Sequence, residues 1–163
     1  MEKQEIEFLE ESNAIEREYS REALRDSINA WEYAKNKKKI SMTQILNIHR
    51  RLMENINPRI AGKIRDVDVY VGNRICLEPH KIRGMLEYLI TIKPSTEEGI
   101  RDWHIEFEKV HPFKDGNGRT GRILMNFQRL KIGLPLLIIH RDEEQFEYYG
   151  WFKQKGGFNS SQA

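Results

Sequence analysis

Apolar side chains recur at intervals of three and four residues along much of this chain, and that spacing constrains its fold more than any other feature. Such a period places them on one face of successive helices. The clearest stretches contain Ala23, Leu24, Ile28 and Trp31; Ile45, Ile48 and Leu52; Ile82, Met85, Leu86 and Leu89; Ile100, Trp103, Phe107 and Val110; and Ile123, Leu124, Phe127 and Leu130. Because each helix must bury its apolar face, we expect an all-α bundle around one core.

Capping residues mark where some of these helices begin. Ser41 with Gln44, and Ser95 with Glu98, have the spacing of a capping box. A last helix is expected over residues 146–152. The first seventeen or so residues are rich in acids and have few apolar side chains, so we expect a helix there that lies on the domain rather than inside it.

One segment departs from the helical pattern. Val67, Val69 and Val71 alternate with polar residues, and Gly72 and Asn73 follow them as turn residues. This pattern predicts a β-hairpin. A hairpin alone is not a stable sheet in a helical protein. From the residues themselves, two interpretations stay open: a surface excursion, or a flap over a cleft.

The stretch at 111–122, His-Pro-Phe-Lys-Asp-Gly-Asn-Gly-Arg-Thr-Gly-Arg, joins two of the expected helices. We expect the second helix to begin near Gly118, where unpaired backbone N–H groups and the helix dipole make an anion site. Gly116 and Gly118 carry no side-chain bulk, so the backbone can approach a phosphate closely. Arg119 and Arg122 share one helix face, and guanidinium groups suit phosphate oxygens.

Two further residues of this stretch add chemistry. Asp115 offers a carboxylate of the kind that binds Mg²⁺ beside phosphate oxygens. His111 titrates near neutral pH and can act as a general base. Taken singly, each feature has an ordinary explanation: a turn, a structural histidine, solvated arginines. Their convergence in one loop favours a phosphate and metal site, and the stretch has neither a Walker A pattern nor zinc-ligand spacing.

Composition narrows the possible classes of protein. A chain of 163 residues suits a single domain, and its formal net charge of +2 argues against a dedicated nucleic-acid binder. Cys76 is the only cysteine, so no internal disulfide can form. No apolar run approaches the ~20 residues of a membrane span. We therefore expect no nucleic-acid or membrane partner and, with no signal peptide visible, a cytoplasmic protein.

The stretch at 111–122 resembles the Fic-family motif HxFx(D/E)GNGRxxR at every position. The resemblance extends from about Ser12 to Phe152 and includes Gly62 and Arg65 ahead of the hairpin. It implies the Fic fold, a helical bundle with a β-hairpin flap. It also implies a protein adenylyltransferase, which moves AMP from Mg-ATP to a Ser, Thr or Tyr hydroxyl of a target protein docked on the flap.

The roles that the resemblance implies agree with the chemistry of the residues. His111 would deprotonate the target hydroxyl, Phe113 would anchor the loop, and Asp115 would hold Mg²⁺ between the α- and β-phosphates. The other residues implied at the nucleotide come from the loop and the following helix, the flap, and a tyrosine pair near the adenine: Gly116, Asn117, Gly118, Arg119, Thr120, Gly121 and Arg122; Val71, Gly72, Asn73 and Arg74; Tyr148 and Tyr149. A place in the core for one of the two tyrosines remains open.

A second feature of the family is an inhibitory helix with the pattern (S/T)xxxE(G/N). Ser12 and Glu16 fit it, whereas Arg17 stands where Gly or Asn is expected. By this resemblance, Glu16 would pair with Arg122 and misalign the triphosphate, and Ser12 would bond to the loop backbone. The alternative is that Glu16 is one more acid on a solvated helix.

These features divide the chain into an inhibitory helix region at 1–19, a Fic domain at 20–155 and a flexible tail at 156–163. Rival functions are a Fic-type enzyme of another transfer type (deAMPylation, other nucleotidyl transfer or phosphorylation) and a silenced toxin–antitoxin component. Gly118 and Arg122, where kinase-like relatives differ, favour AMP transfer, and the intact histidine argues against a dead enzyme. The target protein and the oligomeric state are left open.

Overall fold

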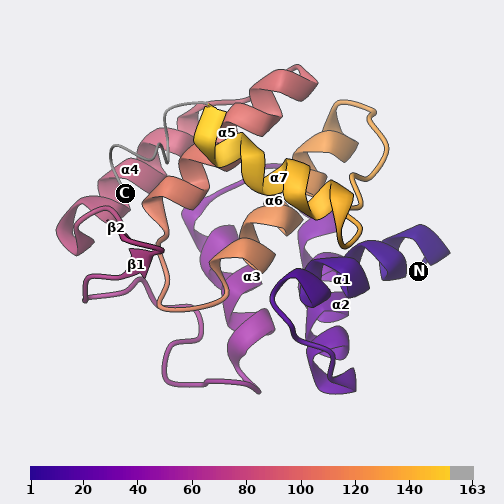
Figure 1. The fold of residues 1–163 in the computed structure, drawn as a ribbon, viewed down its shortest axis with the longest axis horizontal. Helices are drawn as coiled ribbons and strands as arrows, with labels where there is room; N and C mark the ends of the chain where they lie inside the picture. The colour runs from indigo at the N-terminus through magenta and orange to yellow at the C-terminus, as the bar shows by residue number, and fades with distance from the viewer. Residues whose placement is uncertain (155–163) are drawn as a thin grey trace.

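The structure is a computed structural model that describes residues 1–154, so the flexible tail expected at 156–163 lies outside the described residues. Within the described part, helices alternate with loops and one hairpin interrupts them (Figure 1). The elements are α1 (Lys3–Ile15), α2 (Arg21–Lys35), α3 (Met42–Met53), β1 (Tyr70–Val71), β2 (Arg74–Ile75), α4 (Pro79–Thr91), α5 (Glu97–Val110), α6 (Asn117–Lys131) and α7 (Glu143–Gln154). The prediction of a helical fold with one hairpin is confirmed.

One hydrophobic core joins most of the helices, with α6 in the middle of the bundle (Figure 1). Trp31, Ile48 and Phe107 are fully buried there, on α2, α3 and α5. Phe8 and Leu9 of α1 belong to the same core. Helix α1 therefore packs one face into the common core, while Lys3, Gln4 and Glu10 stay exposed at the edge of the fold. The buried face of α1 also includes Ser12, Asn13, Ala14 and Ile15.

The helix starts follow the capping chemistry, with one shift. The Ser41 hydroxyl accepts a hydrogen bond from the Gln44 amide at 3.1 Å, as its spacing predicted. At α5 the cap is Thr96 rather than Ser95, and its hydroxyl accepts from the Gly99 amide at 3.0 Å. Either hydroxyl can cap a helix, so the local sequence did not distinguish between them.

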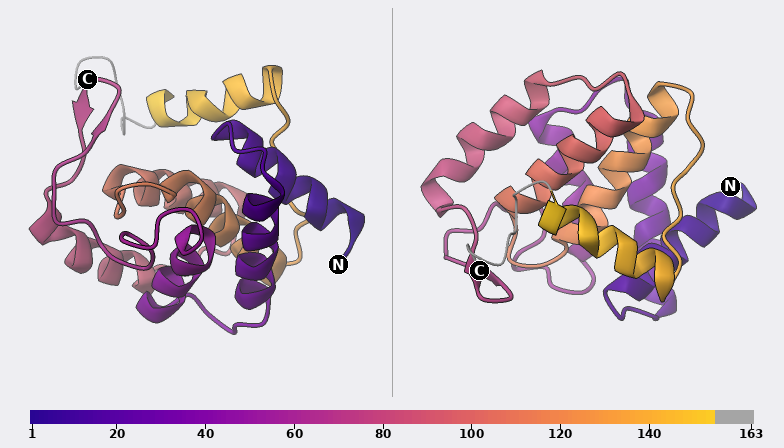
Figure 2. Two further views of the ribbon diagram at one scale, coloured as in Figure 1. Left: turned by 90° about the horizontal axis from the view of Figure 1, so that it is seen from below. Right: turned by 45° about the horizontal axis from the view of Figure 1, so that its top comes forward.

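The hairpin is shorter than the alternating pattern predicted. Its two-residue strands β1 and β2 pair antiparallel across a turn in which Gly72 has φ 60°. One further bond, from the Cys76 amide to the Val69 carbonyl at 2.9 Å, extends the pairing. Figure 2 shows the hairpin projecting from the bundle near the C-terminal end of α7. Because no second sheet packs on it within residues 1–154, little apolar burial is available to lengthen the strands.

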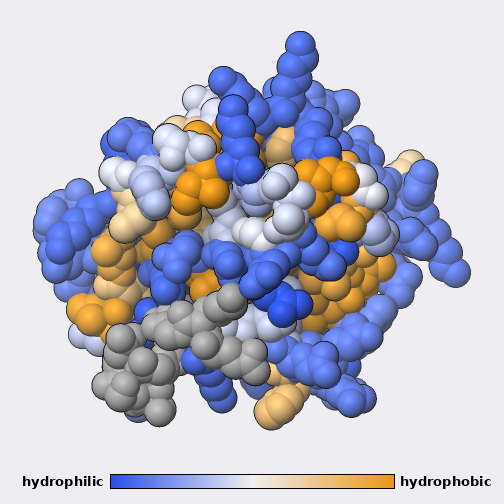
Figure 3. Space-filling view, turned by 90° about the horizontal axis from the view of Figure 1, so that it is seen from above, coloured by the Kyte–Doolittle hydropathy of each residue, from blue (hydrophilic) through white to orange (hydrophobic). Residues whose placement is uncertain are grey.

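The surface combines charged side chains with isolated apolar patches. Figure 3 shows hydrophilic side chains around apolar areas on the face seen from above. Ile92 and Leu130 are among the large apolar residues that keep about two fifths of their surface exposed, 40% and 42%. None of the helices formed by residues 1–154 combines the length and apolar character that crossing a membrane requires.

Candidate active site

Residues 111–122 form the connection from α5 to α6 and the first turn of α6. Helix α5 ends at Val110, its C-cap His111 is left-handed with φ 49° and ψ 63°, and Gly116 at φ 80° is the N-cap of α6. A Cβ atom at Gly116 would lie 2.9 Å from the Met53 sulfur. The reversal between the two helices therefore needs a glycine here, and α6 begins at Asn117, one residue earlier than predicted.

The loop is held by its own side chains. Phe113 is fully buried. Asn117 accepts from the Phe113 amide and donates to the Phe113 carbonyl, both at 2.8 Å. Thr120 is buried, and its hydroxyl donates to the Gly116 carbonyl at 2.8 Å. The side chains of Asn117 and Thr120, which were expected at the nucleotide, instead stabilise the loop.

His49 of α3 supports the same loop and was missed in the sequence, where it is one polar residue on an apolar helix face. Its ring stacks on Phe113 with 3.7 Å between centroids. Nδ1 accepts from the Gly62 amide at 2.9 Å, so Nε2 carries the hydrogen that it donates to the Asp115 carbonyl at 2.8 Å. Burial lowers the pKa of His49 to about 4, which keeps the ring neutral.

Arg65 connects the hairpin to the end of α5. The residue is 3% exposed. Its guanidinium donates to four carbonyl groups, those of His111 at 2.7 Å, Val67 at 2.8 Å, Leu77 at 2.6 Å and Val110 at 3.2 Å. One side chain thus fixes both ends of the hairpin to the segment that carries the candidate base. The resemblance marked Arg65 but not this role.

His111 is oriented as a proton acceptor. Its Nδ1 lies 3.3 Å from the Glu108 carbonyl, and because a carbonyl only accepts, Nδ1 carries the hydrogen and Nε2 is left as the acceptor. Burial is the main cause of a lowered pKa at His111, and Arg65 and Arg74 lower it further. The ring is therefore neutral near pH 7, the form that a general base requires.

A cavity of about 400 Å³ lies between the hairpin, α7 and the start of α6. Its lining brings residues from five parts of the chain together: Glu16, Val71, Gly72, Arg74, Glu108, His111, Gly118, Arg122, Tyr148, Tyr149, Phe152 and Lys153. Several residues expected at the nucleotide do not line this cavity: Asn73, Asp115, Gly116, Asn117, Arg119, Thr120 and Gly121. Asn73 is exposed at the turn, and Gly121 faces α5, where a Cβ would lie 3.0 Å from the His104 ring.

Arg122 has its donors taken by α1 and α7. Nε donates to the Ser12 hydroxyl at 2.8 Å, and Nη2 donates to the Ser12 carbonyl at 3.0 Å and to the Glu16 carboxylate at 2.7 Å. Nη1 donates to the Tyr148 hydroxyl at 3.4 Å. The side chain of Arg122 is 3% exposed, against 40% for Glu16. The predicted pairing of Glu16 with Arg122 is present, but Ser12 bonds to Arg122 and not to the loop backbone.

Arg119 differs from Arg122 because some of its donors have no partner among residues 1–154. It is 5% exposed, it contacts the Met53 sulfur at 3.3 Å, and its Nε and Nη1 have no hydrogen-bond partner among residues 1–154. A buried guanidinium with unmet donors is costly unless an anion satisfies it. Asp115 lies exposed on the same loop, with one oxygen accepting from the Gly116 amide at 2.8 Å. A phosphate beside Arg119 and a divalent ion beside Asp115 fit these residues.

Glu108, on the last turn of α5, is an acid that the sequence did not single out. Its Oε2 lies 4.0 Å from His111 Nδ1, and its Oε1 is buried without a hydrogen-bond partner in the described part of the chain. Burial raises the pKa of Glu108 to about 7, against a smaller opposing effect of Arg122. The carboxyl group is thus protonated below that pH and places a negative charge beside the cavity above it.

The two tyrosines of α7 differ in burial, which settles the alternative left open. Tyr148 is 3% exposed and its hydroxyl lies 2.7 Å from His104 Nε2, so it is the core aromatic, although its edge still lines the cavity. Tyr149 keeps 46% of its surface exposed. It is therefore the tyrosine whose ring is free to meet a ligand.

The fold and the candidate site define a class of protein: a helical domain in which buried arginines lie at the N-terminus of a helix and a hairpin lies beside them. Residues 39–128 match the model of the Fic/DOC family, and the chain belongs to that family. The protein adenylyltransferase fic-1 of Caenorhabditis elegans is 36% identical over 131 residues, 75% of this chain and 25% of that protein. The protein adenylyltransferase Fic of Drosophila melanogaster is 32% identical over 123 residues, 70% and 24%. The chain thus spans about a quarter of the length of these relatives.

Solved structures agree with this assignment. A fragment of Fic-1 from C. elegans superposes with a TM-score of 0.73 and 26% identity, over 92% of this chain and 55% of that one. A Fic-domain signalling protein from Bacteroides thetaiotaomicron gives a TM-score of 0.76 at 20% identity, over 91% of this chain and 70% of that one. The second likeness shows the fold alone.

Proposed function

We propose that this domain is a protein adenylyltransferase that transfers AMP from Mg-ATP to a Ser, Thr or Tyr hydroxyl of another protein. The proposal depends mainly on how a histidine and an arginine are placed around the loop that leads into α6. Within residues 1–154, a neutral histidine whose Nε2 is left as an acceptor precedes the loop, and a buried arginine with unmet donors follows it in the first turn of α6. The names of the relatives at 32% to 36% identity support AMP as the transferred group.

ATP would bind with its phosphates at the start of α6. Gly118 gives the phosphates access to the backbone, and Arg119 and Arg122 supply guanidinium groups. The adenine would lie between the hairpin and α7, against Tyr149. Mg²⁺ held by Asp115 and phosphate oxygens would offset the charge that develops on the departing pyrophosphate.

His111 would perform the proton transfer. Its Nε2 would accept the proton of the target hydroxyl while that oxygen bonds to the α-phosphorus. The bond from the α-phosphorus to its bridging oxygen would break, and pyrophosphate would leave. The other residues mainly orient the reactants and balance charge. A target segment would align along the exposed hairpin by strand addition, beside Val71 and Arg74.

We propose further that Glu16 restrains this reaction. A Cβ at Gly118 would contact the Glu16 carboxylate and lie 2.9 Å from Arg122 Nη1, so the carboxylate lies over the first turn of α6. That is the place where a terminal phosphate would sit and where Arg122 would bind it. A carboxylate competes for the same donors, and the triphosphate would bind with its α-phosphate misplaced.

The backbone conformation of Arg17 accounts for the preference for Gly or Asn after the glutamate in the family pattern. Arg17 has φ 57°, and its amide donates to the Ala14 carbonyl at 2.9 Å while the Glu18 amide donates to the Asn13 carbonyl at 3.0 Å. These two bonds form a Schellman cap, whose left-handed residue is usually Gly or Asn. Arginine keeps the geometry that holds Glu16 in place but adopts it at a cost.

The test is transfer of label from α-labelled and from γ-labelled ATP to protein, with the Glu16→Gly variant and lysate as the source of targets. We expect transfer from α-labelled ATP alone, and none in a Glu16→Gly/His111→Ala double variant. Transfer from γ-labelled ATP would indicate phosphorylation. A folded, ATP-binding variant that transfers neither label would indicate a silenced protein. Release of AMP from a modified target, without any transfer, would indicate removal.

A further inference from the structure

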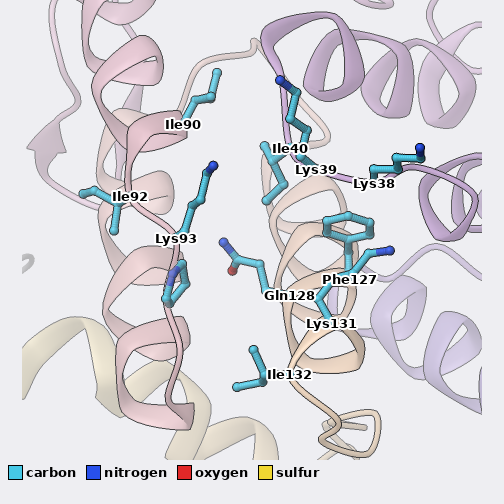
Figure 4. A pocket seen from close by; sticks show the side chains of 11 residues that line it. Lys38, Lys39, Ile40, Ile90, Ile92, Lys93, Phe127, Gln128, Lys131 and Ile132 are labelled. Atoms are coloured by element: carbon cyan, nitrogen blue, oxygen red, sulfur yellow. The ribbon is translucent and has the colours of Figure 1, made fainter.

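A second cavity, of about 190 Å³, lies at the other end of α6 from the candidate active site. Three segments form it: the loop between α2 and α3, the end of α4 with the residues after it, and the last turn of α6 (Figure 4). We call it the lysine groove, and its lining is Lys38, Lys39, Ile40, Ile90, Ile92, Lys93, Pro94, Phe127, Gln128, Lys131 and Ile132. Nothing in the proposed reaction uses these residues.

The floor of the lysine groove is apolar and the groove continues beyond it. Figure 4 shows Ile40, Ile90 and Phe127 around the hollow between the segments. A neighbouring cavity shares Lys39, Ile40, Ile90 and Lys93 with it and continues along the start of α3. Together the two cavities make an extended depression, which suits a short peptide segment better than a small ion.

The rim of the lysine groove is basic, although Glu87 lines the neighbouring cavity that extends it. Four of the groove's lining residues are lysines and none is acidic. Lys38, Lys39 and Lys93 form no ion pair with residues 1–154, and the Lys131 ammonium lies 5.1 Å from the centre of the Phe127 ring. Lys35, at the start of the same lysine-rich run, differs because it pairs with Glu5 at 2.7 Å. Lys38, Lys39 and Lys93 therefore line the groove with ammonium groups that are available to a ligand.

A buried amide adds a second polar feature. Gln128 is 7% exposed, and its Oε1 is buried without a hydrogen-bond partner in the described part of the chain. Figure 4 shows its amide between the α4 side and the α6 side of the groove. An amide with an unmet hydrogen-bonding capacity can bond to the backbone of a docked segment, at either its N–H or its C=O.

We propose that the lysine groove binds an acidic peptide segment of a partner protein, with an apolar side chain on the floor and carboxylates beside the lysines. Charge complementarity carries the choice of partner, since the lysines and the apolar floor need carboxylates and an apolar anchor in one ligand. Asn117 and Gln128 are eleven residues apart on α6, about 16 Å along the helix. The nucleotide cavity therefore stays open when the groove is filled.

Fluorescence polarisation of the full chain tests this proposal. The probe is a fluorescein-labelled peptide of about twelve residues, in which two leucines one helical turn apart are surrounded by aspartates and glutamates. We expect saturable binding that weakens at least ~10-fold in Lys93→Glu/Lys131→Glu. The matched control, Lys3→Glu/Lys63→Glu, changes the net charge equally at exposed lysines outside the groove and should bind as the parent does. A peptide with serines for the leucines should also bind at least ~10-fold more weakly.

Three results would overturn the proposal. Equal weakening by both double variants would show a general charge effect. Equal binding of the serine peptide would show that the floor is not used. Binding to vesicles of phosphatidylcholine and phosphatidylserine that depends on Lys93 and Lys131, without binding of the peptide, would assign the groove to a membrane surface.

The melting temperature and the label transfer of each variant check its fold. Methyl NMR of Ile40 and Ile90 in the unmodified chain must shift on peptide addition.

Discussion

The two ends of α6 show two ways of presenting positive charge. At its N-terminal end, Arg119 and Arg122 are 5% and 2% exposed, and packing fixes where their donors point. At its C-terminal end, Lys131 belongs to a rim of lysines around an apolar floor. Buried guanidinium groups must be matched by a defined anion, whereas exposed ammonium groups tolerate many. The first end suits chemistry on one ligand, and the second suits docking of a variable one.

His111→Ala breaks the N-terminal end most severely. We expect AMP transfer to fall by ~10²–10⁴-fold, the usual contribution of a general base, while ATP binding is retained. Calorimetry measures ATP binding, and label transfer measures the rate of AMP transfer. The matched control is His80→Ala on α4, whose side chain is 73% exposed. Parent activity in the His111 variant would exclude it as the base.

Glu108→Gln tests whether burial raises the pKa of Glu108, which lies near the same end of α6. The folded pKa of Glu108, about 7, lies above the ordinary value of 4.5, so folding is favoured at low pH and that contribution is lost as pH rises from about 4.5 to 7. The glutamine variant has no such loss. Relative to the parent, it should gain up to about 3 kcal/mol in free energy of unfolding between pH 5 and pH 8. Urea unfolding at both values measures it, and a constant difference would show that Glu108 titrates normally.

Glu16→Gly tests whether Arg122 is restrained by α1. We expect AMP transfer at saturating ATP to rise tenfold or more, about 1.4 kcal/mol in activation free energy. Glu10→Gly places the same substitution at an exposed position of α1 and should leave the rate unchanged. A folded Glu16 variant that binds ATP but shows no rise would mean that the contact with Arg122 does not inhibit.

Arg17→Gly should have the smallest effect, in the opposite direction. Glycine adopts φ 57° without the strain of an L side chain, so we expect about 1 kcal/mol more stability at the end of α1. Firmer placement of Glu16 should then lower the basal transfer rate. Thermal unfolding and label transfer check both effects. A less stable variant would show that the Arg17 side chain makes a contribution that outweighs its backbone strain.

The sequence predicted the helices well because their signal is local. The apolar period placed six of them, and the twelve-residue motif located the loop, the candidate base and the two arginines. The sequence was less informative about how deeply each segment is buried. Phe8 and Leu9 bury α1 in the common core, although the acids around them suggested a surface helix. The hairpin came out shorter, because the length of a strand depends on what packs against it.

What the sequence by itself determined is which chemical groups are available and on which helices they lie. Only the tertiary structure decided their partners. Ser12 and Arg122 are separated by 110 positions, and His49 reaches the loop from another helix. Asn117 and Thr120, by contrast, lie in the motif yet turn inward to hold it. The reason is physical: a side chain's chemistry is fixed by its identity, but its burial and hydrogen bonds follow from segments that the fold brings together.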